Sequence, residues 1–341
     1  TTCRCKLLLV IATMRRAVGI HAAATIFSVY SFLLIMRATP AVGFSPLKAH
    51  GNSDFVSTAP SGAGLDRPPS LLDPLLRAFE GDFDNALQHA SDRERAEEHN
   101  GAGTEPGDGY VHENIQCCIR SVTPPPTVAI AHADPAECRC VLAAYYFDRD
   151  PRRIFRLRLY ALRQGVSAGS HVDGWEGPAG RWATMSLYTL GPAAEGSLRS
   201  SAATAASVPG GTGDALVRAW ECMDGPEVSY LPGCDVLWGD EGVSQGNRHS
   251  YLRASDKWAP SPPQGAGGGF HAILINEEGA VLVSPLSGRT IRVRDELSLW
   301  AGTRGELWIN DRAVDEETGE RVYGDPGGTP YVLQRINAAD K

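Results

Sequence analysis

The chain has 341 residues and a formal net charge of −8, with 32 Lys and Arg against 40 Asp and Glu. This acidic balance excludes a basic nucleic-acid binder that neutralises phosphates. The 37 Gly and 23 Pro residues favour many turns and loops over a helical bundle. A hydrophobic content of 43% is enough for a core and excludes disorder of the whole chain.

Residues 1–64 are predicted to be a targeting leader that is removed or disordered. The first 43 residues contain five Lys and Arg and no Asp or Glu, in contrast to the acidic remainder. An arginine pair precedes an apolar stretch, 17–36, and small residues follow at 38–41, as in a signal peptide with its cleavage site. A membrane anchor is the alternative, because the apolar stretch is nearly long enough to span a bilayer. The small residues favour cleavage.

Residues 41–46, Ala-Val-Gly-Phe-Ser-Pro, resemble the junction of bipartite leaders in algae with red-lineage secondary plastids. The stretch 45–70 is rich in Ser, Gly, Pro and Ala, as a transit peptide is. The resemblance implies a plastid protein, in the stroma or the thylakoid lumen, whose mature part is a single domain over residues 65–341. After removal of the leader it would have no stable membrane anchor.

The mature chain begins with helical patterns and then changes to a period of two. A helix is expected over 71–79, and Asp82 or Asp84 is expected to cap a second helix that runs into the polar stretch 91–100. Another helix is expected near 214–223. Short strands, separated by turn residues, are expected at 115–122, 137–147, 154–162, 182–190, 235–238, 270–276, 280–284, 290–294, 307–310 and 331–336.

About ten closely spaced strands predict a mainly β fold, either a sandwich or a closed antiparallel barrel with N-terminal helices. The barrel is favoured because closure removes the exposed edges. Three stretches, near 165–181, 193–213 and 261–269, are expected to be loop insertions because they are rich in small residues, Gly and Pro. The six cysteines beyond the leader form no zinc-binding spacing, so no metal site is expected.

The strand at 154–160 carries the most informative pattern. Alternation places Phe155, Leu157 and Leu159 on one face, and Arg156, Arg158 and Tyr160 on the other. The two guanidiniums would lie about 7 Å apart, which suits paired carboxylates or one extended dianion. The alternative is a solvated outer face of the strand.

For two further segments, too, an ordinary structural interpretation stands beside a functional one. Residues 231–238, Leu-Pro-Gly-Cys-Asp-Val-Leu-Trp, read as a turn into a core strand, with Cys234 a small buried residue. Residues 308–324 place an Asp-Arg pair at the end of a strand, followed by a charged turn and an aromatic-Gly pair. Taken alone, residues 308–324 are typical of a long surface hairpin.

Taken in order, these segments resemble the CpcT/CpeT, or T-type, phycobiliprotein lyases. Residues 81–88, Gly-Asp-Phe-Asp-Asn-Ala-Leu-Gln, match the opening Gly-Asp-Phe-x-Asn-x-x-Gln motif of that family. His112 and the strand at 115–120 match its next motif loosely. The later matches are Ala144-Tyr145, Phe155-Arg156-Leu157-Arg158, Leu-Pro-Gly-Cys at 231–234, Asp-Arg with Glu-Thr-Gly-Glu and Tyr-Gly at 311–324, and Thr-Pro-Tyr-Val-Leu at 329–333.

The chain also departs from the family at several positions. Leu142 stands where the family has a Glu, in the simplest register, and Phe155 stands where it has a Tyr. Ala313 replaces a Gly, and Tyr323-Gly324 replaces Trp-Gly. The missing carboxylate keeps an alternative open, a non-catalytic plastid tetrapyrrole-binding or antenna-assembly protein with the same fold.

The resemblance implies a lipocalin-like (calycin) barrel of about ten strands that holds a phycobilin, a linear tetrapyrrole with two propionates. The enzyme would join this substrate to a cysteine of a phycobiliprotein β-subunit as a thioether, and a homodimer is possible. Arg156 and Arg158 would bind the propionates. Asp311, as the catalytic residue, would accept hydrogen bonds from pyrrole N–H groups and stabilise the protonated bilin. The residues expected to stack on the pigment rings are Tyr145, Tyr160 and Trp238.

Overall fold

A computed structural model describes residues 70–99, 110–130, 138–164, 182–208, 210–240, 269–276, 278–283, 288–300, 305–325 and 329–336. The predicted leader, the expected insertion at 165–181 and nearly all of that at 261–269 lie outside these residues. Within the described chain, no helix is long and apolar enough to cross a membrane.

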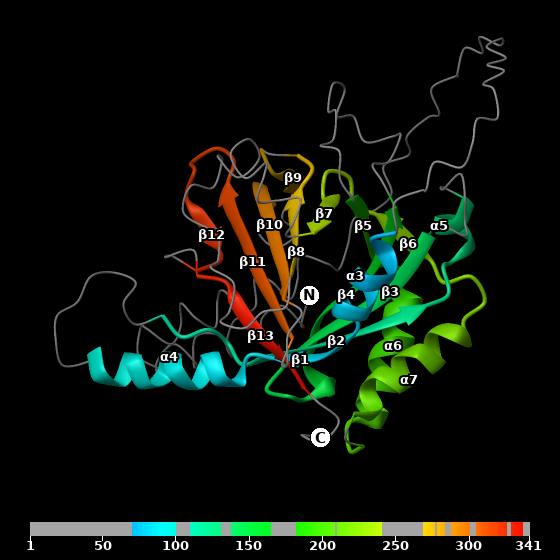
Figure 1. Ribbon diagram of the computed structural model, residues 1–341, viewed down its shortest axis with the longest axis horizontal. Helices are drawn as coiled ribbons and strands as arrows, with labels where there is room; N and C mark the ends of the chain where they lie inside the picture. Colours follow the sequence, from blue (N-terminus) through cyan, green and yellow to red (C-terminus); the bar gives the residue numbers. More distant parts are fainter. Residues whose placement is uncertain are drawn as a thin grey trace, which may run out of the picture.

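The protein is mainly β, and its centre is a closed antiparallel barrel of ten strands, as the sequence predicts (Figure 1). The hydrogen bonds between β10 and β11 close it. In order around the barrel, the strands are β13 (Tyr331–Arg335), β1 (Gly81–Asp84), β2 (Ile115–Val122), β3 (Cys138–Phe147), β4 (Ile154–Gln164), β5 (Trp182–Leu190), β7 (Val236–Asp240), β8 (Gly269–Leu274), β10 (Thr290–Trp300) and β11 (Glu306–Asp315).

Alternate residues of every barrel strand point inward and form one continuous core. Helix α3 (Leu72–Phe79), which the sequence predicts at 71–79, packs its apolar face onto this core. Phe79 is fully buried, and its ring centroid lies 5.7 Å from that of Trp238 and 6.0 Å from that of Tyr160. One part of the barrel interior is therefore filled by a helix and aromatic side chains.

Helices α6 (Pro192–Ala205) and α7 (Gly211–Glu221) cover the outer face of β2 to β5 (Figure 1). The expectation of a loop at 193–213 is therefore wrong for most of that stretch. Ala194, Leu198 and Ala202 recur at helical spacing and are buried on the barrel. Because small residues let the helix approach the sheet closely, a composition that suggests low complexity forms a packed helix.

Asp82 and Asp84 both lie in strand β1, so a helix start at Asp82 is wrong. The expected cap at Asp84 is confirmed in one respect, because its Oδ1 accepts a hydrogen bond from the N–H of Ala86 at the start of the following helix. Phe83 is fully buried inside the barrel, and β1 pairs with both β2 and β13. Helix α4 (Ala86–His99) begins after Asn85 and extends away from the barrel (Figure 1). The segment is too short for its alternation to be recognised, yet without it the barrel would have a gap.

Strands β10 and β11 run beyond the predicted 290–294 and 307–310. The extension of β10 pairs with β8, and that of β11 pairs with β12 (Arg321–Tyr323). The predicted part of β10 pairs with β9 (Ala280–Val283). The Asp311–Arg312 pair, expected at the end of a strand, therefore lies within β11. The remaining elements are α5 (Pro126–Ile130), the 3-10 helix η2 (Pro151–Arg153) and β6 (Val228–Tyr230), which pairs with β5.

Candidate functional site

Strand β4 places two arginines inside the barrel. Leu157 and Leu159 face outward and pack under α6 and α7, so Arg156 and Arg158, the residues that alternate with them, point inward. The side chain of Arg156 is 16% exposed, and Arg158 is 5% exposed. The alternative of a solvated strand face is therefore contradicted.

Phe155 departs from the predicted alternation. An irregularity in the β3–β4 register lies between Tyr145 and Tyr146, and Phe155 belongs to the inner core. Its ring stacks on that of Phe147, with centroids 4.3 Å apart. A bulge of this kind changes which face a side chain occupies, and simple alternation does not anticipate it.

Arg156 forms an ion pair with Asp311 across the barrel. Asp295 lies directly opposite Asp311 in the β10–β11 register, and the two carboxyl groups are hydrogen-bonded to each other. The guanidinium of Arg156 also lies over the ring of Tyr145, 5.6 Å from its centroid. Two strands on one side of the barrel and two on the other thus bring four side chains into one cluster.

The pKa values within this cluster are shifted in opposite directions. Burial and the neighbouring Asp311 raise the pKa of Asp295 well above its usual range. Burial would raise the pKa of Asp311 as well, but Arg156 and hydrogen bonds from Asp295 and Tyr323 lower it. Burial and Arg156 lower the pKa of Arg158 to about 10, so Arg158 stays charged at neutral pH.

Two cavities meet at the Arg156–Asp311 pair. The aromatic cavity has a volume of about 80 Å³. Its aromatic lining consists of Tyr110, Tyr145, Phe147, Phe155, Tyr323 and Tyr331. The aliphatic cavity has a volume of about 70 Å³. Its aliphatic lining includes Met185, Leu187, Leu231, Val236, Ile291 and Val293, and Arg158 and Asp295 also line it. Including space open to solvent at their mouths, the cavities comprise about 630 and 810 Å³, respectively.

The three aromatic residues expected to stack on the pigment are all buried, but only two of them line a cavity. Tyr145 and Tyr160 are both buried, and their hydroxyl groups are 3.2 Å apart. Tyr145 lines both cavities, and Tyr160 lines the aliphatic one. Trp238 is fully buried against Phe79 and lines neither of these two cavities. Three of the six predicted site residues, Arg156, Asp311 and Tyr145, therefore belong to this charged cluster. Arg158 and Tyr160 line the adjoining aliphatic cavity, and Trp238 does not.

Comparisons with known proteins do not assign a function. No protein-family model and no curated protein matches the chain. Among solved structures, a selenomethionine CRL protein of Arabidopsis matches at 14% identity with a TM-score of 0.39. That match covers 77% of this chain and 96% of the other. The similarity is too distant to carry an argument, so the function has to be argued from the site.

The rim of the aromatic cavity holds acidic and phenolic groups that the sequence interpretation missed. Tyr331 donates a hydrogen bond to Glu113, and Tyr110 is hydrogen-bonded to Tyr331. Burial and Glu113 raise the pKa of Tyr110 to about 12. These side chains are supplied by segments far apart in the sequence, and only the closure of the barrel brings them together.

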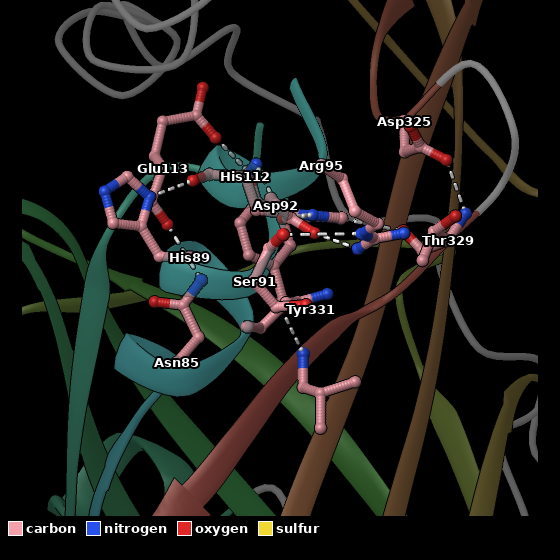
Figure 2. Close-up of polar contacts among 12 residues, drawn as sticks. Asn85, His89, Ser91, Asp92, Arg95, His112, Glu113, Asp325, Thr329 and Tyr331 are labelled. Atoms are coloured by element: carbon pink, nitrogen blue, oxygen red, sulfur yellow. Dashed lines mark hydrogen bonds and ion pairs between the residues drawn. The ribbon is translucent and has the colours of Figure 1, made fainter. Parts of the chain in front are cut away.

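Helix α4 holds this rim in place (Figure 2). Asp92 of α4 is buried, and its Oδ2 lies 2.6 Å from Nδ1 of His112. The same oxygen accepts a hydrogen bond from the backbone N–H of His112. The ring of His112 meets that of Tyr331 edge to face, with centroids 4.9 Å apart. His112 thus supports the cavity wall without lining the cavity.

The motif at 81–88 has a structural role around the same rim. The side-chain amide of Asn85 donates to the carbonyl of Glu113 and accepts from the N–H of Ile115. The amide of Gln88 donates to the carbonyl of Pro330 and accepts from the N–H of Val332. Both amides thus fasten the start of α4 to the strands β2 and β13.

The motif at 311–324 forms the hairpin between β11 and β12. Asp315 accepts hydrogen bonds from the backbone N–H groups of Glu317 and Thr318, which fixes the turn. Gly324 has φ +98°, and a Cβ there would lie 2.9 Å from the carbonyl oxygen of Asp311. Glycine is therefore needed where the hairpin returns past the charged cluster.

The structure also shows where Leu142 and Cys234 lie. Leu142 faces outward, under α6 and α7, so a carboxylate at that position would not reach the interior. The second interior carboxyl is Asp295 instead. Cys234 is buried and lines the aliphatic cavity, and burial together with Asp295 raises its pKa to about 12. Its thiol is therefore protonated near neutral pH.

A third cavity, of about 360 Å³, lies outside the barrel between β1, β2, β13 and the start of α7. Its carboxylates are already held by guanidiniums, Asp82 by Arg120 at 2.7 Å and Asp84 by Arg149 at 2.6 Å. Among the described residues, no group of three His, Cys, Asp or Glu is placed to bind a metal ion. The charged cluster inside the barrel is thus the best candidate site.

Proposed function

We propose that the barrel binds a phycobilin and attaches it to a cysteine of a phycobiliprotein β-subunit, as a T-type lyase does. The observation that carries the proposal is the pair of buried guanidiniums, Arg156 and Arg158, beside cavities inside a closed barrel. Guanidiniums form strong, charge-assisted hydrogen bonds with carboxylates, so two of them on one inward strand face suit the two propionates of a bilin. The ordered motifs of the sequence add support, because they surround this same cluster.

A bilin would lie across the two mouths, since the enclosed parts of the cavities are small. At about 80 and 70 Å³, both cavities are well below the range of about 300–1,000 Å³ that is usual for small-molecule sites, so most of the pigment would lie outside them. The Arg156–Asp311 ion pair stands between the cavities, so a propionate that binds Arg156 would take the place of Asp311. Asp311 would then be released toward the pyrrole nitrogens. The nucleophile would come from the acceptor protein, and the barrel would hold one edge of the pigment toward it.

The first test is bilin retention after replacement of both arginines by leucine, R156L/R158L. Each charge-assisted hydrogen bond contributes about 1.5–3 kcal/mol, so the affinity for biliverdin, which has two propionates, should fall at least tenfold. R152L/R153L is the matched control, because it removes the same charge from exposed positions just before the same strand. Far-ultraviolet circular dichroism should show both proteins folded. Equal pigment retention in the two variants would contradict the propionate assignment.

A second experiment distinguishes a lyase from a carrier protein of the same fold. The protein is loaded with phycobilin and mixed with an apo-β-subunit, and the acceptor is then denatured in acid. Pigment that stays on the acceptor is covalently attached, as the proposed function requires. Pigment that can be extracted, with none left on the acceptor, would favour the non-catalytic tetrapyrrole-binding alternative.

A further inference from the structure

The two interior aspartates have to share a proton. Asp295 and Asp311 are directly opposite each other on neighbouring strands and are hydrogen-bonded. Apart from this mutual contact, the Oδ1 atom of each is buried without a hydrogen-bond partner among the described residues. Two carboxylates in contact repel each other, and a proton on one of them turns the repulsion into a hydrogen bond.

The surroundings decide which carboxyl group holds that proton. Arg156 forms its ion pair with Asp311, and Tyr323 also donates a hydrogen bond to Asp311. Asp311 is thus held as the carboxylate. The raised pKa of Asp295, caused by burial and by Asp311, agrees with this assignment.

The other titratable groups around Asp295 do not give up protons near neutral pH. The arginines of β4, Arg156 and Arg158, stay charged there. The remaining groups are Tyr145 of β3, Tyr160 of β4, Tyr323 of β12 and Cys234, which precedes β7. Burial raises the pKa of each of these four. Asp295 is the acidic proton donor among the described groups that line the aliphatic cavity.

We propose that Asp295 is a catalytic acid that protonates a pyrrole-ring nitrogen of the bound tetrapyrrole, with Asp311 as the counter-ion of the resulting N–H. This inference deepens the proposed function and rests on it. In the step, the O–H bond of Asp295 breaks and an N–H bond forms, which leaves Asp295 as a carboxylate near Arg156 and Arg158. The positive charge on the conjugated pigment makes its exocyclic double bond more electrophilic.

The proton returns to Asp295 at the end of the reaction. The acceptor thiolate forms the S–C bond at the exocyclic double bond, and the proton released by that thiol ends on the neighbouring carbon. The pigment nitrogen gives its extra proton back to Asp295. The net reaction adds S–H across a C=C bond, so no oxidant or reductant is required.

The first experiment needs no pigment. Infrared spectroscopy of the ligand-free protein at neutral pH should show the carbonyl stretch of a protonated carboxylic acid, and D295N should lose that band. E296Q is the matched control, because Glu296 is the next residue and pairs with Asn310 and Arg312 instead. In the wild-type protein, the band should persist well above the pH at which ordinary carboxyl groups ionise. A band that is absent from the wild-type protein, or unchanged in D295N, would overturn the proposal.

The second experiment uses biliverdin as the probe. Bound to the wild-type protein or to E296Q, it should show the long-wavelength absorption of a protonated tetrapyrrole at neutral pH. D295N should bind biliverdin with similar affinity but lose that absorption at a lower pH. The same protonated spectrum in D295N across the titration would refute the role of Asp295. If the wild-type protein binds no biliverdin while the infrared band is present, the proposed function fails and the shared proton stands.

Discussion

The interior of the barrel has two regions built from the same alternating strands but with opposite character. Near α3, buried aromatic residues such as Phe79 and Trp238 pack against each other with tilted rings and fill the interior. Near β12, inward positions carry Arg156, Asp295 and Asp311, and cavities remain. Since buried ion pairs add little net stability compared with apolar packing, the first region stabilises the fold and the second is suited to bind a ligand.

The largest expected effect lies in the filled region. Phe79→Ala should reduce the free energy of unfolding by about 3–5 kcal/mol, because it removes a fully buried ring and leaves a cavity. Urea unfolding would measure the change. Leu87→Ala on α4 is the control, since Leu87 is 60% exposed, and it should change stability by less than about 0.5 kcal/mol. Similar losses in the two variants would show that α3 does not stabilise the barrel.

In the charged region, the loss of stability should depend on whether a substitution leaves one member of the ion pair behind. Arg156→Leu or Asp311→Leu alone should destabilise by about 2–3 kcal/mol, because each leaves a buried charge without its partner. This is less than the loss of about 3–5 kcal/mol for a fully buried pair, because the two side chains keep 16% and 9% of their exposure. The double variant should recover most of that loss, since apolar side chains can fill the same space. A double-mutant cycle by urea unfolding would measure the coupling. Additive losses would mean that the two regions respond to substitution in the same way.

Much of the filled region, and the arginine pair of the charged region, could be predicted from the sequence. The apolar period of 71–79 indicates α3, and the alternation at 154–160 indicates that Arg156 and Arg158 share a face. The antiparallel barrel also follows from the number and spacing of the strands. What alternation alone left open was whether the arginine face lies inside or outside, since both faces of β4 are buried, one by the core and one by α6 and α7.

The carboxyl pair of the charged region is predicted only in part, because the resemblance implies a role for Asp311 while Asp295 lies just beyond the predicted strand 290–294. Asp295 continues the inward series of Ile291 and Val293, and Asp311 continues that of Ile309. An aspartate on the apolar face of each of two neighbouring strands was the signal that would have identified the carboxyl pair. The contacts of Glu113 with Tyr331 had no such signal, since they depend on pairing between distant segments.

The smallest expected effect is a pH dependence that only the charged region contributes. A carboxyl group whose pKa is raised by folding stabilises the protein below its unfolded pKa, about 3.9, and this contribution is lost as pH rises through the folded pKa. The stabilising contribution of Asp295 should therefore decrease between about pH 4 and neutral pH. The pKa of Asp311 is lowered, so its contribution is complete above about pH 4 and is lost only in more acidic solution.

The variant D295N cannot ionise but can still donate a hydrogen bond to Asp311, so its stability should depend less on pH. From about pH 5 to pH 8, its free energy of unfolding should rise relative to that of the wild-type protein by on the order of 1 kcal/mol. Urea unfolding across this range, with E296Q as reference, would measure the gap. Parallel profiles would place the proton elsewhere and remove the main electrostatic distinction between the two regions.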